Sequence, residues 1–210
     1  MNSAHAINKK HYKKALNFYT ALIEKIMTSH ITSKKIVLVC PRYGSTLAMI
    51  EVLSRYFDLR GIILKNSTKK NDNTLQFLRS ANYPVLDISK TDMVTLSPST
   101  IEILVQAIGP GSSCVVLDHG GYFSLNRQAL SILKPNLISG IAEYAINGES
   151  RYFNASTGDR PFISVGRSMI KKNSDLASAN SIMLIAELYL QNQGIMLFGS
   201  DVRVGVIGHG

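Results

Sequence analysis

The sequence contains no tryptophan and only two cysteines among its 210 residues. A small secreted scaffold held together by disulfides needs more cysteine pairs than this, so that class of protein is excluded. Cys40 and Cys114 each lie at or within an apolar run, KIVLVC and SCVVLD, which is typical of a buried strand. We therefore expect two reduced thiols in the core and a cytoplasmic location.

Long hydrophobic runs and the spacings of common metal sites are also missing. No segment approaches the ~20 apolar residues that a membrane span requires, and no apolar stretch has the length of a signal peptide. The sequence has no Cys-x-x-Cys pair and no two histidines four residues apart. We expect no membrane partner and no bound metal ion.

Acidic residues are few, because 14 Asp and Glu stand against 23 Lys and Arg and give a formal net charge of +9. Such a balance suits an anionic ligand or polymer. The lysine clusters lack interleaved aromatic residues, which favours solvated surface lysines, and we do not expect nucleic acid as a partner. The alternative is a basic interaction module built on the helix that carries Lys9–Lys14, with salt-sensitive binding to nucleic acid.

The sequence does contain 45% hydrophobic residues, enough for a full globular core. Apolar runs alternate with segments of helical spacing along the chain. Strands are expected at 35–40, 61–64, 84–88, 113–117, 137–142 and 162–165. Helices are expected at 4–29, 45–56, 73–81, 98–108 and 175–193. This alternation predicts an α/β fold, a doubly wound, mostly parallel Rossmann-like sheet.

In such a fold the ligand lies beyond the carboxyl ends of the strands, so the loops at those ends are candidate functional segments. Four loops qualify: Pro41-Arg42-Tyr43, Asp118–Gly121, Glu143-Tyr144 and Gly166–Ser168.

The last residues resemble the opening of a second nucleotide-binding unit. A short apolar strand, Val202–Ile207, runs into the Gly-x-Gly of Gly208 and Gly210. In dinucleotide-binding proteins the first glycine permits a tight turn, and the second lets the backbone approach a pyrophosphate. We expect an α/β domain over 1–180, and over 181–210 a connecting helix and the truncated start of an NAD-binding domain that continues past Gly210. A plain strand with a glycine turn is the alternative.

Three segments, taken in order, resemble a known enzyme family. They are LDHGG (Leu117–Gly121), GIAEYAING (Gly140–Gly148) and PFISVGRSMIKKNSD (Pro161–Asp175), and the apolar Gly-x-Gly strand follows them. Together they resemble the amino-terminal, substrate-binding half of S-adenosylhomocysteine hydrolase. The resemblance implies an NAD-dependent hydrolase of one-carbon metabolism that acts on a nucleoside thioether. It also implies a small nucleoside-type ligand and a homo-oligomer.

The resemblance assigns roles to particular positions. Lys171 and Asp175 match a lysine near the ribose 3′ carbon and an aspartate that holds the ribose hydroxyls, which implies catalytic roles for both. An ordinary surface pair at a helix start, with Asp175 as a cap, is the alternative. Substrate-binding positions are matched by Asp118, His119, Glu143 and Tyr43. NAD-binding positions are matched by Gly208, Gly210 and Asn147.

Several family residues are replaced. Pro41 and Tyr43 stand where the family has histidine and threonine, His119 replaces the second of two aspartates, and Tyr144 replaces the second of two glutamates. A site that loses this many polar groups does not keep its mechanism through its fold alone. We therefore expect a divergent homologue with no adenosylhomocysteinase activity in the chain as given. The alternative is a non-catalytic protein that binds a nucleoside, a dinucleotide or a partner chain.

Overall fold

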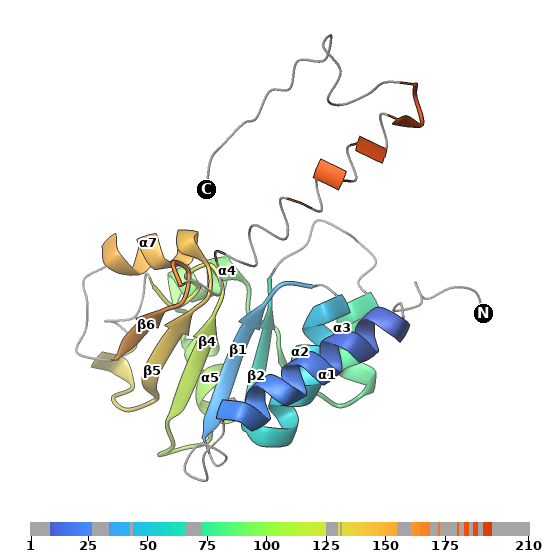
Figure 1. Ribbon diagram of the computed structural model, residues 1–210. Helices are drawn as coiled ribbons and strands as arrows, with labels where there is room; N and C mark the ends of the chain where they lie inside the picture. The colour runs from blue at the N-terminus through green and yellow to red at the C-terminus, as the bar shows by residue number, and fades with distance from the viewer. Residues whose placement is uncertain are drawn as a thin grey trace. The chain divides into compact units, whose positions relative to one another are not determined.

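The structure is a computed structural model. It describes residues 9–26, 34–42, 44–65, 73–124, 132–154 and 161–168, together with residue 130 and separate residues between 172 and 194. The described residues form one parallel sheet in the order β3-β2-β1-β4-β5-β6 (Figure 1). Its strands are β1 Lys35–Cys40, β2 Asp58–Leu64, β3 Val85–Leu86, β4 Cys114–Asp118, β5 Ile138–Glu143 and β6 Phe162–Ser164. The predicted doubly wound, Rossmann-like α/β fold is confirmed.

The central strand β1 contributes to a core on each face of the sheet. Ile36, Leu38 and Cys40 belong to one hydrophobic cluster, whereas Val37 and Val39 belong to the other. Successive side chains of a strand point to opposite faces, and all five of these are buried. The strand is therefore apolar along its length, as a strand covered on both faces must be.

One face is covered by α1 (Lys9–Ile26), α2 (Gly44–Tyr56) and α3 (Asn73–Ser80). α2 packs directly on the sheet through its buried apolar side chains, and α1 packs against α2. The Tyr12 hydroxyl of α1 donates a hydrogen bond to the Glu51 carboxylate of α2, which fixes the two helices to each other.

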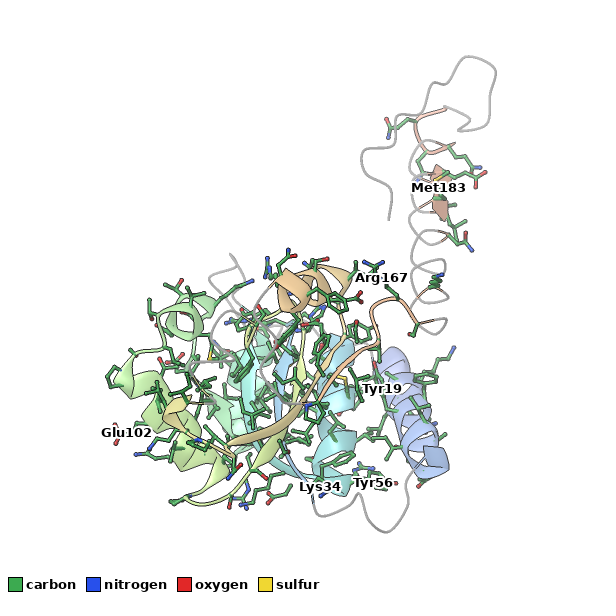
Figure 2. All side chains as sticks on the ribbon, turned by 90° about the vertical axis from the view of Figure 1, so that its left-hand side faces the viewer. Tyr19, Lys34, Tyr56, Glu102, Arg167 and Met183 are labelled. Carbon is green, nitrogen blue, oxygen red and sulfur yellow. The ribbon has the colours of Figure 1, made fainter. Side chains whose placement is uncertain are left out.

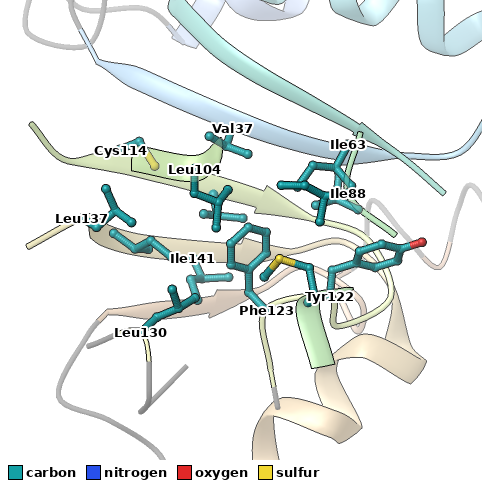
Figure 3. Packing of buried hydrophobic residues seen from close by; sticks show 14 of the residues in the cluster. Val37, Ile63, Ile88, Leu104, Cys114, Tyr122, Phe123, Leu130, Leu137 and Ile141 are labelled. Carbon is teal, nitrogen blue, oxygen red and sulfur yellow. The ribbon is translucent and has the colours of Figure 1, made fainter. Parts of the chain in front are cut away.

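The opposite face is covered by α4 (Lys90–Thr95), α5 (Pro98–Ile108) and α7 (Ile146–Asn154). Figure 3 shows the core on this side, where Leu104 of α5 and Phe123 pack among side chains of the strands. Because the helices lie on both faces, the central strands gain most of their stability from apolar burial on two sides.

The side view makes this layering visible. Figure 2 shows Tyr19 on α1 and Glu102 on α5 at opposite sides of the sheet. The sheet is therefore the middle of three layers.

The six expected strands are confirmed, and β2 begins three residues earlier than predicted, at Asp58. Two of the helices whose bounds are given above, α4 and α7, were not predicted. α4 has six residues, too few for a periodic apolar pattern, although its capping box of Ser89 and Asp92 was a local signal. α7 contains Asn147-Gly148, which reads as a turn in sequence because glycine destabilises helix interiors.

Both cysteines are free and buried, as predicted. Burial raises the pKa of the Cys40 and Cys114 thiols to about 12. Among the described helices, none combines the length and the apolar character needed to cross a membrane.

The chain divides into two compact units, Met1–Gly166 and Arg167–Gly210. All six strands and both hydrophobic clusters lie in the first unit. The expected strand Val202–Ile207 and its glycines lie outside the described residues. The domain boundary at residue 180 stays a prediction.

Candidate functional site

The sheet has a topological switch point between β1 and β4. The chain proceeds outward from β1 to β2 and β3 on one side, and from β4 to β5 and β6 on the other. Open α/β sheets place ligands beyond the carboxyl ends of the strands at such a point. We call the residues that follow β1, β4 and β5, namely 41–42, 119–121 and 144–145, the switch-point edge.

Glu143, the last residue of β5, holds the loop that follows β4. Its side chain is fully buried. One carboxylate oxygen accepts hydrogen bonds from the backbone N–H groups of Gly120 at 3.0 Å and Ala145 at 2.6 Å, and the other accepts from Gly121 N–H at 2.9 Å. A buried carboxylate is stabilised by several such donors. Glu143 therefore joins two of the three segments that carry the family resemblance, through contacts between residues 22 and 23 positions apart in sequence.

Gly148 of α7 makes room for this carboxylate. A Cβ atom built on Gly148 would overlap both oxygens of Glu143. Any larger residue would displace either the helix or the carboxylate. The packing explains why a glycine occupies the interior of α7, where it costs helix stability.

Asp118, at the end of β4, is also buried, with only 2% of its surface exposed. Its oxygens accept hydrogen bonds from the backbone N–H of His119 at 2.7 Å, from Phe123 N–H at 3.1 Å and from the Tyr152 hydroxyl at 2.5 Å. Burial raises the pKa of this carboxyl from 3.8 to about 6, and the Tyr152 hydrogen bond opposes the rise. Both carboxylates that the sequence analysis selected, Asp118 and Glu143, thus hold the loop after β4 by accepting hydrogen bonds from its backbone.

His119 and Tyr144 are the side chains that follow these two carboxylates. Their rings meet edge to face, with centroids 5.5 Å apart. Tyr144 is 49% exposed, so its ring is accessible at the switch-point edge. The exposed Tyr144 ring therefore offers an apolar face beside the half-buried His119 imidazole, which suits a ring-shaped ligand.

A third buried carboxylate, Glu149, lies further along α7. It accepts a hydrogen bond from the Ser164 hydroxyl at 2.5 Å, and Ser164 in turn accepts from Gly166 N–H at 3.2 Å. These contacts fasten α7 to the end of β6. Glu149 therefore holds α7 beside the end of β6. Its position in the sequence did not indicate this role.

Basic side chains gather around Gly120. Arg151 of α7 donates from Nη1 to the Gly120 carbonyl at 2.5 Å, and Lys90 of α4 donates from Nζ to the same oxygen at 3.3 Å. A Cβ on Gly120 would lie 3.2 Å from Nζ of Lys65. These cations could not be predicted from the sequence, because each lies in or next to a different helix or strand and none belongs to a recognisable motif.

The remaining predicted site residues fall into two groups. Asn147 is exposed on α7, two residues past the edge. Tyr43, Lys171, Asp175, Gly208 and Gly210 lie outside the described residues. Asp118, His119 and Glu143 do come together at one place, as the fold class predicted.

Within the described part of the chain, no three His, Cys, Asp or Glu side chains gather in a way that could hold a metal ion. A scan of protein-family models and a search of curated proteins found no match to this chain.

Proposed function

We propose that this chain contains a nucleoside-binding domain, a divergent relative of the substrate-binding half of S-adenosylhomocysteine hydrolase, with its ligand at the switch-point edge. The observation that carries the proposal is the bonding of Glu143 to Gly120 and Gly121. Two of the segments on which the resemblance rests, LDHGG and GIAEYAING, thereby meet beyond the carboxyl ends of neighbouring strands. α/β sheets of this order bind ligands at that place.

The chemistry of the edge supports recognition of a flat heterocycle. The exposed Tyr144 ring provides a stacking surface, and the half-buried His119 imidazole lies beside it. Purine bases bind to proteins by stacking on aromatic rings and by hydrogen bonds to their edges. A nucleoside would place its base against these rings and its ribose toward the Gly120–Gly121 loop.

The proposal does not include hydrolysis. In the related enzymes carboxylates touch the substrate, whereas the oxygens of Asp118 and Glu143 are occupied by backbone N–H groups and by Tyr152. His119 and Tyr144 replace the second carboxylate of each pair. Of the positions that the resemblance assigns to NAD, Gly208 and Gly210 lie outside the described residues, and the proposal makes no use of NAD.

The test is a calorimetric titration of adenosine into the full chain. We expect saturable binding that weakens about tenfold in Tyr144→Ala, because the loss of an aromatic ring stacked on a base costs about 1–3 kcal/mol, and about 1.4 kcal/mol corresponds to a factor of ten. His119→Ala should weaken binding in the same direction.

Phe77→Ala is the matched control, since Phe77 is an aromatic side chain 42% exposed on α3, which contacts β3, and β5 lies on the other side of β1 in the sheet. Its affinity should equal that of the unchanged protein. Absence of adenosine binding, or equal losses in Tyr144→Ala and Phe77→Ala, would contradict the proposal.

A further inference from the structure

Three cationic side chains lie around one glycine, Gly120, at the switch-point edge. Arg151 and Lys90 both donate to Gly120 O, and the ammonium of Lys65 lies beside the same glycine. Lys65 follows β2, Lys90 begins α4 and Arg151 lies in α7. The fold therefore assembles a positive cluster that no stretch of sequence contains.

The Gly120–Gly121 peptide separates this cluster from the buried carboxylate of Glu143. The peptide is trans, so its N–H and C=O groups point in opposite directions. Its N–H donates to Glu143, and its carbonyl accepts from Lys90 and Arg151. The carboxylate consequently lies on one side of the loop, and the cations lie on the other.

The cluster has more positive charge and more donors than this arrangement uses. An ammonium has three N–H donors and a guanidinium has five, whereas Lys90 and Arg151 each direct one to Gly120. The ion pairs found among the described residues are formed by other side chains, Arg55 with Glu51, Arg60 with Asp58 and Arg79 with Asp87. Because the three cations are half-buried, their field is screened less than that of fully exposed lysines.

We propose that Lys65, Lys90 and Arg151 form an anion site that takes the phosphate of a nucleoside monophosphate. The inference deepens the proposed function and rests on it for the nucleoside part of the ligand, whereas the anion part rests on the three cations alone. Arg151 supplies planar donors that match phosphate oxygens, and the two lysines supply point charges.

Three probes separate the parts of this proposal in titrations of the full chain at low ionic strength: adenosine, adenosine 5′-monophosphate and inorganic phosphate. We expect the monophosphate to bind at least about tenfold more tightly than adenosine, since one charge-assisted hydrogen bond contributes this much. Inorganic phosphate should bind weakly and compete with the monophosphate. Added salt should weaken the binding of both anions more than that of adenosine.

The variants Lys65→Gln, Lys90→Gln and Arg151→Gln each remove one charge from the cluster. Each should reduce the affinity for the monophosphate about tenfold, and Lys65→Gln, which removes no hydrogen bond to the Gly120 carbonyl, should leave that for adenosine within about a factor of two. Lys65→Gln is the safest variant for folding, because its ammonium makes no hydrogen bond within the described part of the chain.

Lys35→Gln is the control. Lys35 Nζ donates to the Ile108 carbonyl at 3.0 Å and to Ser112 Oγ at 2.7 Å, at the amino end of β1. The substitution removes the same charge and a similar lysine-to-carbonyl contact at the amino end of β1, whereas the switch-point edge lies at the carboxyl ends of the strands. It should leave all three affinities unchanged.

The outcomes separate the two proposals. If adenosine binds and adenosine 5′-monophosphate binds no more tightly, the anion site is overturned and the nucleoside proposal is unaffected. The three cations would then serve only to balance the charge of Glu143. Phosphate binding that depends on the three cations, together with absence of adenosine binding, would support the anion site and overturn the nucleoside proposal.

Discussion

At the scale of residues, this protein places buried carboxylates where its sequence predicts ligand contacts. Asp118 and Glu143 end neighbouring strands, and each saturates its oxygens with donors from the adjacent loops. A buried charge without such donors would cost several kcal/mol, of order 2–7 even for a neutral polar group. The two carboxylates thus fix the conformation of the loop and leave recognition to its exposed neighbours, His119 and Tyr144.

Asp118 should make the stability of the protein depend on pH. Its pKa rises from 3.8 when unfolded to about 6 when folded. The folded state therefore binds more protons between these values, so the stability from this carboxyl is fully present below pH 4 and is lost as pH rises through 6. The loss is about 3 kcal/mol. Urea unfolding of Asp118→Asn from pH 4 to 7, followed by circular dichroism, should lack this loss.

Tyr152→Phe separates this effect from a general change in stability. The Tyr152 hydroxyl lowers the pKa of Asp118, so its removal should move the pH-dependent loss to higher pH. Identical pH profiles for the unchanged protein and Asp118→Asn would show that Asp118 does not carry the perturbed pKa.

Gly148→Ala should reverse the usual effect of alanine in a helix. Alanine normally stabilises a helix interior by up to about 1 kcal/mol relative to glycine. Here the new Cβ would collide with Glu143, and overpacking of this kind costs about 1–3 kcal/mol. The midpoints of denaturant unfolding of Gly148→Ala and of the unchanged protein measure the difference in stability.

The control for this prediction is Gly140→Ala in β5. A Cβ there meets its nearest atom, the Pro161 carbonyl oxygen, at an ordinary 3.5 Å. It should change stability by less than Gly148→Ala does. A stabilised Gly148→Ala protein would mean that Glu143 does not lie beneath α7.

At the scale of elements, the helix boundaries follow local chemistry. Ser97 caps α5 by accepting the Thr100 N–H at 3.2 Å, and Pro98 occupies the first turn, where no N–H is needed. Gly109 ends the helix with a φ of 96°, in the region that favours glycine. α7 has no comparable local pattern, and the fit of Gly148 over Glu143 positions it.

Ser97→Ala should destabilise the protein by about 1 kcal/mol, because one backbone donor of α5 loses its partner. Ser54→Ala serves as the comparison, since Ser54 Oγ donates to the Glu51 carbonyl on the exposed face of α2. That substitution should be neutral or slightly stabilising, since alanine has the higher helix propensity. Equal losses in thermal unfolding would show that Ser97 is not a cap.

At the scale of the whole molecule, one unit contains the entire sheet. Residues 1–166 include the six strands, both hydrophobic clusters and the switch-point edge. A sheet with apolar cover on both faces has the core that an independent domain needs.

A chain of residues 1–166 should therefore fold by itself. We expect mixed helix and strand content by circular dichroism and a single cooperative transition in urea. Because the protein has no tryptophan, tyrosine fluorescence is the second probe. A gradual transition, or different midpoints from the two probes, would contradict independent folding.

The strands, the parallel sheet and the position of the candidate loops can all be predicted from sequence patterns. Continuous apolar runs such as KIVLVC are buried on both faces, and the caps of α5 are local, so each could be predicted without knowledge of the fold. The folded chain adds three contacts that no pattern predicts: Glu143 reaches the Gly120–Gly121 loop, Gly148 leaves room for its carboxylate, and Lys65, Lys90 and Arg151 lie around Gly120. The physical reason is that these contacts depend on strand order and helix placement, which bring distant residues together, whereas sequence patterns report only on neighbours along the chain.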